Sequence, residues 1–116
     1  MVNLDPKRIT ELRTLMGDEL GSVVETLLES LTESIEQVET ALADEQLDDA
    51  TRAAHRARND ALLVGASQLL GALTDLETAT RAQQLGPARQ AWQRALAVWP
   101  ATREELEQLA GRGCPQ

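Results

Sequence analysis

The chain has 116 residues, of which 42% are hydrophobic and 26% charged, and its formal net charge is −8. This length fits one domain, so we expect residues 1–116 to form a single unit. An acidic chain is a poor partner for nucleic acid or for an anionic membrane, because both require a basic surface. The absence of Phe and Tyr, beside many Ala, Leu, Glu, Gln and Arg residues, predicts a helical protein.

Sequence features that mark export or membrane insertion are missing. The first residues do not follow the pattern of a secretory signal, and the longest apolar runs are too short to span a membrane. Cys114 is the only cysteine, which excludes an internal disulfide and a cysteine-based metal cage. We therefore expect a cytoplasmic protein.

The first half of the chain predicts two helices. Asp5 and Pro6 are typical of a helix start, and the short helix that follows should end at Gly17. Its inner face is predicted to hold Ile9, Leu12, Leu15 and Met16. A second start at Asp18 leads into a long amphipathic helix of about 25 residues, because apolar side chains recur every three or four residues. That stripe consists of Leu20, Val24, Leu27, Leu31, Ile35, Val38 and Leu42.

The second half predicts three more helices. The first of them follows a turn at 43–46 and ends at Gly65; its inner face is mostly alanine (Ala50, Ala54, Ala57, Ala61), so its backbone should lie close to its neighbours. The next runs from Ala66 and fades near 81–85. Gly86 and Pro87 should separate it from a last helix over 88–109, which carries Trp92 and Trp99 as core residues. Pro100 predicts a kink or an interruption there, with a restart at Thr102. Residues 111–116 are expected to be a frayed tail.

These helices together predict an all-α fold, an antiparallel up-down four-helix bundle with a short additional N-terminal helix. No further apolar face demands a second subunit, so we expect a monomer.

Few kinds of catalytic site fit this sequence. His55 is the only histidine, there is no glycine-rich phosphate loop, and neighbouring acids such as Asp48 and Asp49 diverge around a helix. We therefore expect no metal, no cofactor and no enzymatic turnover of the protein's own.

The surroundings of His55 differ from those of an ordinary core histidine. On a helical wheel the residue points away from the alanine face, and Arg52, Arg56 and Arg58 surround it with no acid between residues 50 and 59. Leu62 lies on the same outward side. One interpretation is a surface histidine beside helix-forming arginines. The other is an imidazole nucleophile that attacks phosphorus, with arginines that bind the phosphoryl oxygens.

The segment Ala53-Ala54-His55-Arg56-Ala57-Arg58-Asn59, followed by Gly65-Ala66, Leu73 and Leu76-Glu77, resembles the histidine-containing phosphotransfer (HPt) family. The resemblance covers essentially the whole chain. It implies a four-helix bundle whose exposed histidine, here His55, accepts a phosphoryl group from a receiver-domain aspartate and passes it to another receiver. The receiver would bring the aspartate and Mg²⁺.

The family pattern also implies roles for neighbouring residues. Arg58 stands where the family usually has Lys, and keeps a positive charge near the phosphoryl group. Asn59 stands where the family usually has Gly; its side chain narrows the approach to the imidazole or hydrogen-bonds the phosphoryl group. Ala57 replaces the usual Leu, and Asp60 the usual Ser, which allows an Arg56–Asp60 pair.

Two hypotheses follow. The first is a histidine phosphotransfer protein of a bacterial-type two-component phosphorelay, with His55 as the phosphoacceptor and Arg58, Asn59, Arg52, Arg56 and Leu62 as phosphoryl- or partner-binding residues. The second is an interaction module that binds a receiver or another signalling partner without being phosphorylated. In both, the partner is a receiver domain of a response regulator or a hybrid sensor kinase, or a related protein.

Overall fold

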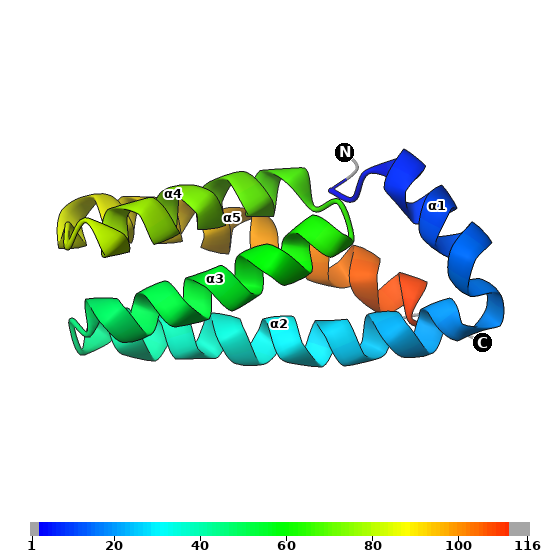
Figure 1. The fold of residues 1–116 in the computed structure, drawn as a ribbon, viewed down its shortest axis with the longest axis horizontal. Coiled ribbons are helices and arrows are strands. Elements are labelled where there is room, and N and C mark those ends of the chain that lie inside the picture. Colours follow the sequence, from blue (N-terminus) through cyan, green and yellow to red (C-terminus); the bar gives the residue numbers. More distant parts are fainter. Residues whose placement is uncertain (1–2, 112–116) are drawn as a thin grey trace.

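The computed structural model describes residues 3–111, and this part of the chain consists of helices and short turns without a strand. The helices are α1 (Pro6–Met16), the 3-10 turn η1 (Gly17–Glu19), α2 (Leu20–Ala43), α3 (Leu47–Leu63), α4 (Ser67–Arg81) and α5 (Leu85–Leu109). Helices α2 to α5 run alternately up and down in one elongated bundle (Figure 1). The predicted all-α four-helix bundle with a short N-terminal helix is confirmed.

The four long helices, α2 to α5, surround one core, and each packs against two of the others. Helix α2 packs against α3 and α5, and α4 packs against α3 and α5. The core holds the predicted stripe of α2 and both tryptophans. The buried residues of α3 are all alanines, namely Ala50, Ala53, Ala54, Ala57 and Ala61, and only Leu47 at its start adds a larger, partly buried side chain. Small side chains let the α3 backbone lie close to α2 and α4, which fixes the position of whatever projects from its outer face.

The start of the chain covers one end of the bundle (Figure 1). The Asp5 carboxylate accepts the backbone N–H of Lys7, which caps α1, and the Asp5 backbone N–H donates to the carbonyl of Gly65 at 2.9 Å. The side chain of Arg8 donates to the carbonyl of Leu63. The carboxylate of Glu105 on α5 accepts hydrogen bonds from both nitrogens of Asn3. Residues 3–8 therefore connect the α3–α4 turn to the end of α5.

Three details differ from the sequence-based expectation. Leu15 is exposed, because the apolar contacts of α1 with the core are made by Leu12 and the partly buried Ile9 and Met16. Helix α5 begins at Leu85, before Gly86 and Pro87, since proline fits the first turn of a helix as well as a loop.

Pro100 does not interrupt α5, which continues through it to Leu109. Thr102 does not restart a helix; its hydroxyl donates to the carbonyl of Val98 one turn back. The tail expected at 111–116 lies outside the described residues apart from Gly111.

None of the helices between residues 3 and 111 combines the length and the apolar character that crossing a membrane requires.

Candidate functional site

His55 lies in the middle of α3, on the face opposite the alanines. Its neighbours Ala54 and Ala57 are fully buried, whereas 43% of the His55 side chain is exposed. The imidazole therefore stands at the surface on a helix whose other face is fixed in the core.

A buried carboxylate on α4 holds the imidazole. The Glu77 side chain is only 7% exposed, and its Oε2 atom lies 3.1 Å from Nδ1 of His55. The same oxygen accepts a hydrogen bond of 2.5 Å from Arg81, one turn along α4. The other oxygen, Oε1, lies 3.1 Å from Nε of Arg58 in an ion-pair contact that lacks hydrogen-bond alignment.

These partners keep Glu77 ionised. Burial by itself raises the pKa of the Glu77 carboxyl, but the hydrogen bonds from Arg81 and His55 and the charge of Arg58 act in the opposite direction. The net result is a Glu77 pKa below its usual value of 4.5. Near neutral pH the group is therefore a carboxylate, which can only accept hydrogen bonds.

The hydrogen-bond network assigns the tautomer of His55. Since the Glu77 carboxylate can only accept, Nδ1 carries the proton and donates it to Oε2. Nη2 of Arg58 lies farther from Nδ1, at 3.3 Å. The remaining ring nitrogen, Nε2, then carries a lone pair, and it is the nitrogen that Glu77 leaves free to act as a nucleophile.

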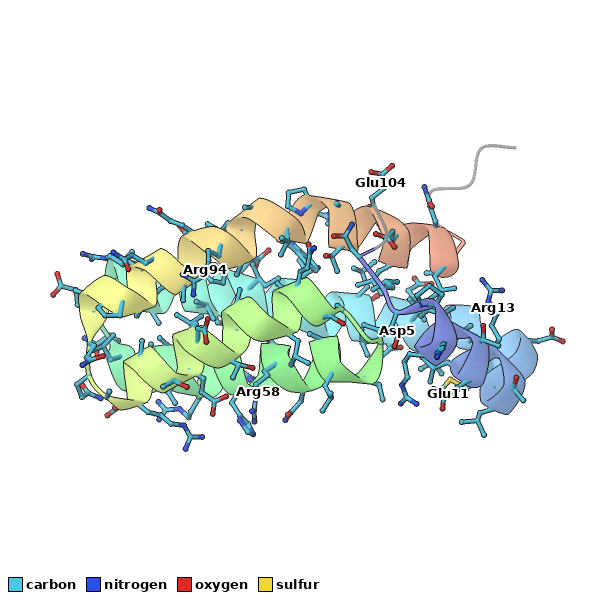
Figure 2. All side chains as sticks on the ribbon, turned by 90° about the horizontal axis from the view of Figure 1, so that it is seen from above. Asp5, Glu11, Arg13, Arg58, Arg94 and Glu104 are labelled. Carbon is cyan, nitrogen blue, oxygen red and sulfur yellow. The ribbon has the colours of Figure 1, made fainter. Side chains whose placement is uncertain are left out.

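Two surfaces of different character meet at His55. On one side, an open hollow of about 500 Å³ is lined by Thr51, Arg52, His55, Arg56 and Arg81. On the other side, toward the end of α3, lie Asn59, Leu62 and Leu63, which line a second hollow together with residues of α1. Leu62 is 61% exposed. Figure 2 shows Arg58 projecting outward at this edge of the bundle.

The structure brings the expected residues together and adds two. His55, Arg58, Asn59 and Leu62 lie along one face of α3, and Arg52 and Arg56 border the hollow beside it. Arg56 forms no ion-pair contact with Asp60; it donates to the amide oxygen of Gln37, while Asp60 accepts from Ser30.

Glu77 and Arg81 are functional candidates to which the sequence assigned no role, although Glu77 is one of the residues that carry the family resemblance. One signal was available for Glu77. It follows Leu73 by four residues on the inner stripe of α4, where an acid must have a partner. Within residues 3–111, no group of three or more His, Cys, Asp and Glu side chains is placed to hold a metal ion.

Comparison with known proteins decides the family. A sequence model of the Hpt domain matches residues 22–112, more than half of the chain. The chain belongs to the Hpt domain family. As an Hpt domain, it is a histidine phosphotransfer protein of the two-component phosphorelay type, and the resemblance seen in the sequence is confirmed.

A solved structure has the same fold as this Hpt domain. The crystal structure of histidine-containing phosphotransfer protein B (HptB) from Pseudomonas aeruginosa PAO1 matches with a TM-score of 0.87. The match covers 97% of each chain at 21% sequence identity, so it includes the N-terminal helix as well as the bundle. No curated protein matches the chain in a sequence comparison.

Proposed function

We propose that this Hpt domain is a phosphorelay carrier that accepts a phosphoryl group on Nε2 of His55 from the aspartyl phosphate of one receiver domain and passes it to another. The observation that carries the proposal is the Glu77–His55 contact, because the Glu77 carboxylate favours the tautomer with the proton on Nδ1 and so leaves Nε2 as the nucleophile. His55 is also the only histidine of a protein whose family works through one.

The transfer step balances without a base in the Hpt domain. The lone pair of Nε2 forms the new N–P bond while the P–O bond to the aspartate breaks, and the aspartate leaves as a carboxylate with that electron pair. The ring keeps its Nδ1 proton and becomes a cation, which the Glu77 carboxylate stabilises at 3.1 Å. Return transfer reverses these changes, so the carrier ends each cycle unchanged and has no turnover of its own.

The positive side chains complete the site. Arg58 and Arg81 together exceed the single charge of Glu77, so the site has an excess of positive charge for the dianionic phosphoryl group. Arg58, which is one-third exposed, can turn from Glu77 toward a group on His55. Arg58→Ala should weaken transfer or shorten the lifetime of phosphohistidine, whereas Arg94→Ala, on another part of the bundle (Figure 2), should leave both unchanged.

The exposed leucine is the proposed anchor for the receiver. Burying one such side chain at an interface contributes on the order of 1.5–3 kcal/mol. Leu62→Ala should therefore weaken receiver binding about tenfold or more by titration calorimetry, with little change in the melting temperature, because Leu62 is 61% exposed. A large fall in melting temperature would instead show that Leu62 supports the fold.

The experiment that tests the carrier is phosphotransfer from a panel of receiver domains labelled with radioactive acetyl phosphate. The expected product is a label that is acid-labile, alkali-stable and absent from His55→Gln. The alternative, an interaction module, is favoured only by Asn59, whose exposed side chain narrows the approach to His55. A receiver that binds the wild-type protein and His55→Gln equally, and transfers label to neither, would support that alternative and reject the proposed phosphorelay carrier.

A further inference from the structure

The hollow beside His55 has an unusual wall. Apart from Thr51 and the imidazole, the residues that line it are three arginines, Arg52, Arg56 and Arg81, and none of the lining residues is acidic. Arg81 is occupied by the buried Glu77, so it belongs to the phosphoacceptor site. The side chains of Arg52 and Arg56 form no hydrogen bond or ion pair with His55 or Glu77, and they border the hollow; we call these two residues the basic rim.

The partners of the basic rim are weak. Arg52 pairs with Asp49 one turn back on α3, and both side chains are more than half exposed. Arg56 donates to the neutral amide of Gln37 on α2. Its charge also acts on Asp60, without an ion-pair contact. Exposed pairs of this kind contribute little to stability, so both guanidinium groups can take a new partner at small cost.

The basic rim also borders an acidic surface. On its far side lies another hollow, between α2 and α3, which Arg52 and Arg56 share with Glu33, Glu36, Asp44 and Asp49. The two arginines therefore separate His55 from the acidic surface of α2. In a protein of net charge −8, an acidic partner is repelled from most directions and attracted to this edge.

We propose that the basic rim is a specificity determinant: it selects those receiver domains that present acidic side chains at the edge of their docking surface, opposite Arg52 and Arg56. The inference rests on the proposed function, since it concerns the partner of the same site. The receiver's apolar contact would lie over Leu62 and its acidic edge over the rim, with His55 between them. Charges at the edge of an interface act mainly on the rate of association and on the choice of partner.

The test compares the double variant Arg52→Glu/Arg56→Glu with Arg94→Glu. Arg94→Glu is a control for one such charge reversal because, like Arg52, Arg94 is an exposed arginine paired with an exposed aspartate, here Asp75 on a different part of the bundle. Transfer rates are measured for the panel of receivers at about 20 mM and about 500 mM NaCl, since screening at high salt removes interactions between exposed charges.

For receivers with an acidic edge we expect transfer to the double variant to be about tenfold slower at low salt and within about threefold of wild type at high salt. Transfer from receivers with a neutral or basic edge should be unchanged or faster. The ranking of the receivers by transfer rate therefore differs between wild type and double variant. Replacing the acidic residue of a preferred receiver with Lys should restore its transfer to the double variant.

Three results would overturn the inference while leaving the proposed carrier function intact. These are an unchanged ranking of the receivers by transfer rate, an equal slowing of transfer by Arg94→Glu, or a slowing in the double variant that high salt does not reduce. Chemical phosphorylation by phosphoramidate needs no protein partner and should be the same in wild type and double variant. If chemical phosphorylation fails only in the double variant, Arg52 and Arg56 act on the phosphoacceptor itself and the inference is wrong. If no receiver labels even the wild-type protein, the proposed function and the inference are both rejected.

Discussion

Glu77 shows how one residue couples stability to function. A carboxylate in the inner stripe of α4 is costly to bury, and the cost is offset because Arg81, Arg58 and His55 converge on it. The same contacts fix the imidazole and place positive charge around it. The side chain that holds His55, the proposed phosphoacceptor, in place is therefore also part of the packing between α3 and α4.

The first prediction concerns pH. The pKa of Glu77 is lowered by folding, so its ionised form contributes stability above the usual value of 4.5, and this contribution is lost as the pH falls through the lower folded-state pKa. Glu77→Gln should lower the free energy of unfolding at pH 7 by about 1–3 kcal/mol and flatten its decline below pH 4.5. Urea unfolding at a series of pH values measures both effects.

Asp60 provides a control for that experiment, because its pKa is shifted in the opposite direction to that of Glu77. Burial raises the pKa of its carboxyl, although the Ser30 hydrogen bond and the charge of Arg56 oppose the shift. The folded state then binds this proton more tightly, so Asp60 adds stability as the pH falls and loses it as the pH rises. Asp60→Asn should steepen the acid decline that Glu77→Gln flattens; equal changes in the two variants would contradict both assignments.

Asn59 gives a prediction about access to the imidazole. It lies one turn beyond His55 on the exposed side of α3, where its side chain lines the hollow next to Leu62. Asn59→Gly removes this side chain and costs about a few tenths of a kcal/mol in helix propensity. If Asn59 only restricts access, rapid-quench transfer assays should show faster transfer from receivers. Slower transfer would show that Asn59 orients the phosphoryl group or the partner.

At the level of elements, the α3–α4 turn is a junction in which both space and backbone conformation are constrained. Gly65 has a φ of +69°, and a Cβ added to it would meet the Cβ of Asp5 at 2.9 Å and that of Arg8 at 3.1 Å. Both the backbone conformation and the close approach of α1 therefore require glycine.

A matched pair of alanine substitutions tests this junction. Gly65→Ala should lower the free energy of unfolding by about 2–4 kcal/mol through strain and collision. Gly71→Ala, inside α4 with nothing near its added Cβ, should raise it by about 0.5–1 kcal/mol. Denaturant unfolding compares the two, and a Gly65→Ala protein as stable as wild type would show that α1 does not depend on this contact.

Helices α2 and α3 could be predicted from their residues because apolar spacing and the alanine face report directly on what is buried. The start of α5 and its continuity through Pro100 could not be predicted in this way. A proline removes one backbone N–H group, and the effect of that loss on a helix depends on the surrounding structure. Likewise, the outward position of His55 follows from the wheel, whereas its contact with Glu77 joins residues 22 positions apart on two helices. Spacing within one helix carries no information on such a contact.

The whole molecule carries its charge unevenly. Residues 1–50 hold 13 acids and 3 bases, and residues 51–116 hold 6 acids and 8 bases. Much of the excess lies on α2, which has no basic residue at all. The repulsion within this surface opposes compact folding, and the fold tolerates it because the apolar stripe of α2 is buried against α3 and α5.

Screening should therefore stabilise the protein. Raising NaCl from about 10 to about 200 mM at pH 7 should raise the melting temperature by about 2–5 °C. At a pH near the sequence pI of 4.6 the net charge vanishes, and the salt effect should vanish with it. Calorimetry at both pH values checks this, and a larger salt effect near the pI than at pH 7 would contradict the role of net charge.

The hydrogen bonds between Asn3 and Glu105 link residues 102 positions apart. Closing so long a loop is slow and costs entropy, whereas α2, α3, α4 and α5 assemble through contacts between successive helices. We therefore expect the N-terminal segment to dock last during folding and to open first in native-state hydrogen exchange. Because that segment also holds the α3–α4 turn at Gly65, its opening would loosen the end of the helix that carries His55 without unfolding the bundle.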